Sequence, residues 1–211
     1  MYERWEIKGH VVEFISEDHL YICDGIILPS VTTMLKMRFG GKYTAVTPEV
    51  LNRAADLGTE MHKAIQDFEE QGIESELKEV KNYKFLKKHY QWECLKNEVP
   101  VILFQGGEPI ACGRIDMVGM IGGERALFDF KRTSQLDKEY LGYQLNLYRI
   151  AYQQSYGGEI TALKGIHLRG DTRKLIDIRI NEQMMWDFIK DWQETQSYIN
   201  EVNERRKANE K

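Results

Sequence analysis

The chain has 211 residues, of which 42% are hydrophobic and 29% charged, a composition typical of a globular protein with its own core. No run of about 18 apolar residues is present, and the first residues, MYERWEIKGH, lack the apolar core of a signal peptide. We therefore expect no membrane span, a cytoplasmic location and a single domain covering residues 1–211. The net charge of −4 does not indicate a nucleic-acid partner, although a local basic patch can bind one whatever the total.

The N-terminal segment, residues 5–28, has the pattern of short strands separated by turns. The expected strands are residues 10–15, 20–22 and 26–28. A helix should follow, with Ser30 as its N-cap. A second interpretation of Ser30 is that hydroxyl and free amide groups at a helix start bind phosphate.

Two longer helices are expected next. The first runs from Pro48, which suits the first helical position, to about Glu70 before Gly72, and it carries His62. A lone histidine on a helix is most often only a partly buried side chain. The second helix is expected over residues 76–98, with Lys84 and Lys88 on one basic face, for which exposure to solvent is the default explanation.

A hairpin in the middle of the chain concentrates the polar residues of most interest. The paired glycines of Met120–Glu124 predict a tight turn between two strands. Asp129 and Lys131 lie two residues apart on the second strand, so their side chains leave the same face. Asp116 lies 13 residues before Asp129, on the neighbouring antiparallel strand.

These side chains suit a hard divalent cation. Mg²⁺ and Mn²⁺ take carboxylate oxygens and waters, and a lysine beside them can orient an attacking water. Taken alone, an Asp-x-Lys sequence is more often a salt bridge at a strand edge. The second aspartate on the adjacent strand favours the cation.

The rest of the chain predicts further helices and strands. A helix over 136–156 carries Gln144 and Tyr148 one turn apart, and strands are expected over 162–168 and 175–180. The last helix should run from Glu182 to about Glu204, with residues 204–211 frayed. Strands alternating with helices, together with hairpins, predict an α/β fold with a central mixed β-sheet flanked by helices.

The order of these residues resembles the PD-(D/E)XK nuclease superfamily, in its RecB-type or phage-type exonuclease branch. That branch has a helix histidine, an aspartate, an Asp/Glu-x-Lys and a helix Gln-x-x-x-Tyr in this order. The corresponding residues here are His62, Asp116, Asp129 with Lys131, and Gln144 with Tyr148. The segment LPSVTTML, which contains Ser30, is also similar to phage-type members.

The resemblance implies a restriction-endonuclease-like core and a cation site. Mg²⁺ or Mn²⁺ would be held by His62, Asp116, Asp129 and the Phe130 carbonyl. Lys131 would position a water, and Gln144 with Tyr148 would hold Lys131 or contact a phosphate. Some relatives carry an iron–sulfur cluster on four cysteines, but this chain has three, Cys23, Cys94 and Cys112, so we expect no cluster.

The implied function is a metal-dependent DNA exonuclease acting at linear duplex ends in phage-type recombination or repair. Expected DNA contacts are Ser30, Thr32, Lys84, Lys88 and Arg132. A single-strand annealing protein and further copies of the chain are possible partners. The alternatives are a structure-selective DNA endonuclease and a non-catalytic DNA-binding protein with the nuclease fold.

Overall fold

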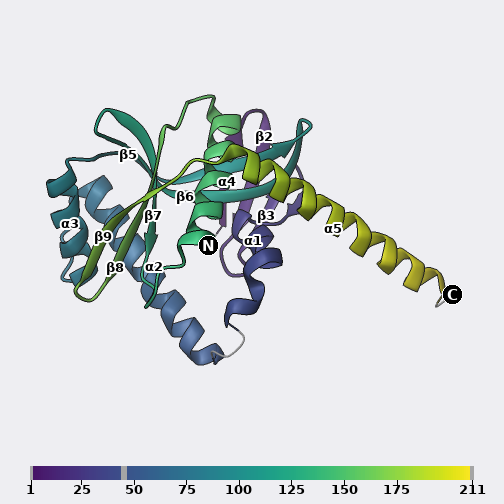
Figure 1. Cartoon of the computed structure of the whole chain (residues 1–211), viewed down its shortest axis with the longest axis horizontal. Coiled ribbons are helices and arrows are strands. Elements are labelled where there is room, and N and C mark those ends of the chain that lie inside the picture. The colour runs from purple at the N-terminus through teal and green to yellow at the C-terminus, as the bar shows by residue number, and fades with distance from the viewer. Residues whose placement is uncertain (1, 44–46, 210–211) are drawn as a thin grey trace. The chain divides into compact units, whose positions relative to one another are not determined.

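The computed structural model describes residues 2–43 and 47–209. Its contacts group the chain into two units, Met1–Ile180 and Asn181–Lys211. The first unit holds two β-sheets and four α-helices among the described residues, which makes the fold mixed α/β (Figure 1).

A small antiparallel sheet occupies the N-terminus. Its strands, in spatial order, are β1 (Tyr2–Ile7), β2 (His10–Ile15), β3 (Leu20–Cys23) and β4 (Ile26–Leu28). The last three confirm the predicted strands, whereas β1 extends the segment beyond the predicted start at residue 5. Lys8 and Gly9, with φ of 54° and 84°, form the two-residue turn that joins β1 to β2.

The helices that follow begin and end largely where the sequence predicts. Ser30 is the N-cap of α1 (Val31–Phe39) and accepts a hydrogen bond from the Thr33 amide. A short 3₁₀ turn, η1 (Gly40–Tyr43), follows it. Helix α2 (Pro48–Gln71) ends at Gly72, whose φ of 69° suits glycine.

The central sheet is mixed, as predicted. Its order is β5-β6-β7-β8-β9, with β7 and β8 parallel and the other neighbours antiparallel. The strands are β5 (Glu93–Gln105), β6 (Glu108–Ile121), β7 (Glu124–Lys131), β8 (Ala162–Arg169) and β9 (Thr172–Ile178). Gly122 and Gly123, both with positive φ, make the predicted turn between β6 and β7.

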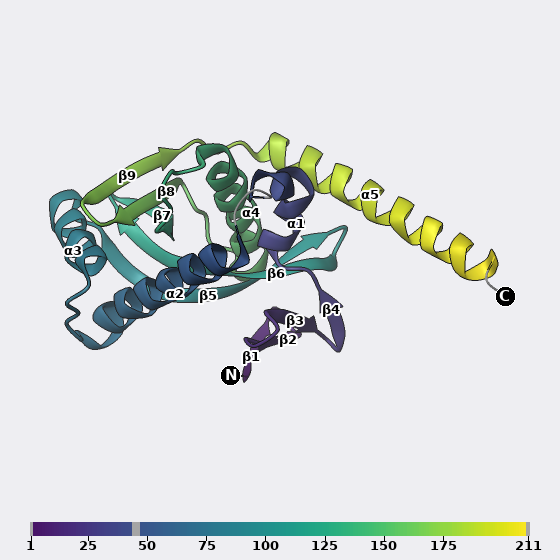
Figure 2. The same ribbon diagram turned by 90° about the horizontal axis from the view of Figure 1, so that it is seen from below.

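Helices cover both faces of this sheet. On one face, α2 and α3 (Lys78–Tyr90) bury a cluster that includes Ile65, Tyr83 and Phe128. On the other face lies α4 (Lys138–Tyr156), and Gly165 of β8 leaves the space that Leu141 of α4 fills. The small sheet packs against the β5–β6 hairpin through a second apolar cluster (Figure 2).

One edge of the central sheet is bonded to side chains of α4. Ser155 Oγ accepts from the Ile102 amide at 3.0 Å and donates to the Ile102 carbonyl at 3.2 Å. Gln154 bonds both backbone groups of Phe104 in the same way, at 2.8 and 3.0 Å. The Tyr156 hydroxyl donates to the Pro100 carbonyl at 2.6 Å. Helix α4 is thereby fixed along β5.

The predicted helix over residues 76–98 is wrong in its second half. Helix α3 ends at Tyr90, and residues 93–98 belong to β5. Gln91 adopts a left-handed conformation with φ of 55°, a position that usually carries glycine. Because this position holds Gln91 and not glycine, the sequence does not show that the helix ends here.

Helix α5 (Glu182–Asn209) forms the second unit. It extends past the predicted end at Glu204, so residues 204–209, expected to be frayed, are helical, while 210–211 lie outside the described residues. Lys, Arg, Glu and Ala are strong helix formers, which accounts for the extension. No helix in the described part of the chain is long and apolar enough to cross a membrane.

Candidate active site

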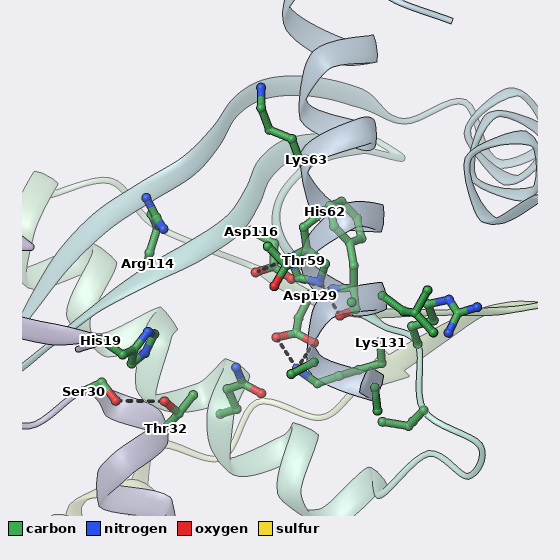
Figure 3. A pocket seen from close by; sticks show the side chains of 18 of the residues that line it. His19, Ser30, Thr32, Thr59, His62, Lys63, Arg114, Asp116, Asp129 and Lys131 are labelled. Atoms are coloured by element: carbon green, nitrogen blue, oxygen red, sulfur yellow. Dashed lines mark hydrogen bonds and ion pairs between the residues drawn. The ribbon is translucent and has the colours of Figure 1, made fainter. Parts of the chain in front are cut away.

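A pocket of about 1980 Å³ opens within the first unit, between the central sheet, α2, the start of α1 and the small sheet. Most of the predicted site residues line it. They are Ser30, Thr32, His62, Asp116, Asp129, Phe130, Lys131, Arg132, Gln144 and Tyr148. Figure 3 shows His62, Asp116, Asp129 and Lys131 gathered in this pocket.

Asp116 is held by the backbone of the neighbouring strand. Its Oδ2 accepts a hydrogen bond of 2.6 Å from the Phe130 amide, and its side chain is 14% exposed. The β6–β7 register places it beyond the Met117–Phe128 pair, at the end where the two strands stop pairing. One carboxylate oxygen is thus fixed, and Oδ1 points toward α2.

Buried Asp129 and partly exposed Lys131 leave the same face of β7, as the strand period predicts, and form an ion pair. The Lys131 Nζ lies 2.9 Å from Asp129 Oδ1 and 2.7 Å from Oδ2. Burial raises the pKa of Asp129 to about 6, and Lys131 partly opposes that rise. For Lys131, burial lowers the pKa, but the carboxylates of Asp129 and Asp116 outweigh it and raise the pKa overall.

His62 reaches the hairpin from α2. Its Nε2 lies 3.0 Å from the Phe130 carbonyl, which can only accept, so Nε2 carries the proton and donates. The other nitrogen, Nδ1, faces Asp116 Oδ1 at 3.6 Å, too far for a good hydrogen bond. The ring is therefore oriented by the backbone, with Nδ1 toward the Asp116 carboxylate.

Gln144 and Tyr148 come from α4 and are both buried. Tyr148 packs on Gly113, where a Cβ atom would lie 2.7 Å from Tyr148 Cε1, so the glycine that begins the Gly-Arg-Ile-Asp segment makes room for the ring. Burial raises the pKa of Tyr148 well above its usual value, so its hydroxyl stays protonated. The Gln144 Oε1 atom is buried without a hydrogen-bond partner among the described residues.

The predicted phosphate contacts differ in their surroundings. Ser30 Oγ is already bonded to Thr32 Oγ1 at 2.8 Å and to the Thr33 amide, which supports the capping role (Figure 3). Arg132 donates from Nε to the buried Glu79 at 2.8 Å. Both residues border the pocket, but their described bonds are structural.

Lys84 and Lys88 are not brought to the pocket. Lys84 pairs with Glu74 at 2.6 Å, and Lys88 lies on the exposed side of α3. Neighbouring Lys81 and Lys87 pair with Glu76 and Glu69. The expected basic face is therefore largely neutralised by acids of residues 69–76.

The structure adds two charged residues that the sequence did not indicate, Glu98 and Arg114. Glu98 lies in β5 and has its Oε2 2.8 Å from Arg114 Nε, while Arg114 Nη1 donates to Glu3 Oε1 at 2.8 Å. Burial and the nearby Asp116 raise the pKa of Glu98 to about 7. Single donor atoms of His62, Glu98 and Asp116 lie within 4.8 Å of one another, a group that does not include Asp129.

The pocket is richer in basic than in acidic side chains. Seven of its lining residues are Lys or Arg, namely Arg53, Lys63, Arg114, Lys131, Arg132, Lys138 and Arg169. Five are Asp or Glu, namely Glu3, Glu98, Asp116, Asp129 and Asp137. The pocket thus combines a small group of acids with basic groups around it.

Comparisons with known proteins add little to this geometry. No protein-family model matches the chain, and no curated protein matches it. Among solved structures, one described as "Crystal structure of SSO0001" is 17% identical, covers 79% of this chain and 75% of that chain, and has a TM-score of 0.46. That similarity is too distant to carry an argument about family or function.

Proposed function

We propose that the chain is a metal-dependent deoxyribonuclease with a restriction-endonuclease-like core of the PD-(D/E)XK type. The observation that carries the proposal is the meeting of His62, Asp116, Asp129 and Lys131 in one pocket, although they come from three separate elements. A buried acid that is paired with a lysine beside a second acid is costly for stability, and such groups are typical of catalytic sites.

The donor set suits Mg²⁺ or Mn²⁺. Asp116, Asp129 and the Phe130 carbonyl offer oxygen ligands, and His62 adds a nitrogen that Mn²⁺ accepts well. A cation bound there would polarise a phosphodiester and lower the pKa of a water molecule.

Lys131 has the position for two tasks. Lys131 lines the pocket with its ammonium group paired to Asp129, so it can orient a water or stabilise the negative charge that develops on the phosphate. Tyr148, protonated by virtue of burial, and Gln144 can donate hydrogen bonds to a phosphate oxygen or position Lys131.

The basic residues around the acids support a polyanionic substrate. Lys63, Arg53 and Lys138 border the same pocket, and phosphate contacts of this kind supply most non-specific affinity for DNA. By the resemblance, we propose action at linear duplex ends in phage-type recombination or repair, in the cytoplasm. An annealing protein and further copies of the chain would be its partners.

The test compares linear duplex DNA with covalently closed circles of the same sequence, incubated with Mg²⁺ and either the natural chain or Asp129→Asn. We expect progressive loss of the linear DNA only, and none with the variant. Cleavage of circles at a similar rate would replace the exonuclease with a structure-selective endonuclease. Binding without cleavage of either DNA would replace it with a non-catalytic DNA-binding protein.

A further inference from the structure

We propose that His10, Cys23 and Asp24 of the small sheet form a binding site for one zinc ion or a similar divalent transition-metal ion. The site lies where β3 ends and the turn to β4 begins, and none of its three residues lines the pocket of the candidate active site. The inference does not depend on the proposed nuclease activity.

Strand geometry brings the three residues together. Val12 of β2 pairs with Cys23 of β3, and His10 lies two residues before Val12, so the His10 and Cys23 side chains leave the same face of the small sheet. Asp24 follows Cys23 directly and adopts a left-handed conformation with φ of 49°. One donor atom of each residue, a ring nitrogen, a sulfur and a carboxylate oxygen, lies within 4.8 Å of the other two.

The Asp24 carboxylate is held toward His10 by the backbone. Its Oδ1 accepts a hydrogen bond of 2.8 Å from the Val11 amide, and its Oδ2 lies 2.6 Å from His10 Nδ1. The His10 ring packs beside Phe104 of β5, with 5.3 Å between the ring centroids. One oxygen is therefore fixed by the strand, and the other faces a ring nitrogen that can bind a metal.

The separations suit a tetrahedral ion after a small movement. With bonds of about 2.0 Å to nitrogen and oxygen and about 2.3 Å to sulfur, the donor atoms of a tetrahedral zinc site lie about 3.3–3.6 Å apart. The ion would replace the proton between His10 Nδ1 and Asp24 Oδ2 and widen their 2.6 Å separation by about 0.7 Å. These two side chains are 29% and 46% exposed, so they have room for that movement.

The donor set favours a transition metal over Mg²⁺. A thiolate and an imidazole suit Zn²⁺, whereas Mg²⁺ prefers oxygen ligands. Three protein ligands leave the fourth position of a tetrahedral ion to water, which can reach the exposed side of Asp24. His10 also lines a second pocket, of about 440 Å³, through which an ion can enter.

Cys23 is buried in the apolar cluster between the small sheet and the β5–β6 hairpin. Burial raises the pKa of its thiol, as does the charge of Asp24, whereas a hydrogen bond with Cys112 opposes the rise. Binding of an ion would release the thiol proton, and Cys112 would remain as a hydrogen-bond partner of the thiolate. The bound ion would join the start of β2 to the end of β3 and so stabilise the small sheet.

A simpler interpretation is that Cys23 only fills the core and that His10 and Asp24 only form a surface ion pair. The chain provides matched controls for the cysteine and for the acid. Cys94 is a partly buried thiol in β5, and Asp18 is an exposed acid in the turn between β2 and β3. Neither belongs to the group of three residues.

The experiment titrates the reduced chain with Co²⁺ and follows the near-ultraviolet charge-transfer band of a cobalt–thiolate bond. The described residues that line the active-site pocket include no cysteine, so an ion bound there gives no such band. We expect one Co²⁺ per chain to produce the band in the natural chain and in Cys94→Ser but not in Cys23→Ser, and Zn²⁺ to displace it. A natural chain without the band, or an equal loss in both cysteine variants, would overturn the proposal.

A second pair of variants covers the case in which Cys23→Ser does not fold. His10→Ala and Asp24→Asn change partly exposed side chains, and each should lower the Co²⁺ affinity, measured by the same band, about tenfold or more. Asp18→Asn should leave the affinity unchanged. An affinity equal to that of the natural chain in either His10→Ala or Asp24→Asn would overturn the site of three residues.

Discussion

The pocket and the outer face of α3 contain the same kinds of charged residue in opposite arrangements. On α3, each of Lys81, Lys84 and Lys87 has its own glutamate within 2.6 Å. In the pocket, Glu98 pairs with Arg114 and Asp129 with Lys131, but a third acid, Asp116, raises the pKa of both. Exposed pairs contribute about 0–1 kcal/mol each and need no ligand, whereas buried acids with raised pKa values are concentrated at functional sites, and we propose a cation as the ligand of this one.

The largest effect should come from removing a member of the pocket. We expect Asp116→Asn, Asp129→Asn and Lys131→Ala each to lower the DNA cleavage rate by about 10²–10³-fold or more. Any two together should cost little more than one, because the residues act as a unit. A rate close to that of the natural chain in Asp129→Asn, with normal melting, would contradict the nuclease assignment. Lys84→Ala serves as the control on α3.

The next effect concerns the metal dependence of cleavage. His62→Ala should raise the Mn²⁺ concentration needed for half-maximal activity by about 10–100-fold, with recovery at high Mn²⁺ exceeding that at high Mg²⁺. The check is a metal titration beside a melting curve of the metal-free variant. An unchanged titration with a lower melting temperature would make His62 a packing residue only.

The burial of Glu98 beside Asp116 should make the stability of the metal-free protein depend on pH. The pKa of Glu98 is raised to about 7, so between its usual value and 7 the folded chain binds a proton that the unfolded chain does not. Stability should therefore fall as pH rises through this window, by about 2–3 kcal/mol for this group.

Glu98→Gln removes that dependence. With metal chelated, we expect the variant to melt several degrees above the natural chain at pH 8 and close to it at pH 5, since Arg114 keeps Glu3 as a partner. Melting curves at the two pH values are the measurement. A variant that melts lower at pH 8 would mean that the Arg114 pair outweighs the repulsion from Asp116.

The smallest effect is expected on α3. Replacing Lys84 and Lys88 together by Ala should weaken DNA binding little and leave its salt dependence nearly unchanged, because Lys84 is already neutralised by Glu74. Lys63→Ala, at the pocket, should lower the salt slope by about 1. If the α3 double variant changes the salt slope of DNA binding more than Lys63→Ala does, the DNA contacts α3.

The sequence predicts the central hairpin and its polar residues well, because local rules determine them. Two glycines with positive φ define the turn, and the two-residue strand period places Asp129 beside Lys131. The Ser30 cap and the Gly72 helix end follow from equally local chemistry. These features require no knowledge of distant contacts.

Local rules do not predict that Glu98 lies in the pocket. The helical pattern of α3 passes into β5 through Gln91, which carries the left-handed turn without glycine, so residues 93–98 are expected to be helical. A residue assigned to a helix cannot be paired with Asp116 on a strand. The strand β1 is missed for a related reason, since its turn rests on Lys8 as well as Gly9.

The bonds between α4 and β5 have a consequence for association. An outer strand with free amide and carbonyl groups can recruit a strand from another molecule and start aggregation. At Pro100, Ile102 and Phe104 those outward groups are occupied by side chains of α4. This stretch of the sheet therefore resists strand addition, and copies of the chain that assemble must do so through other surfaces.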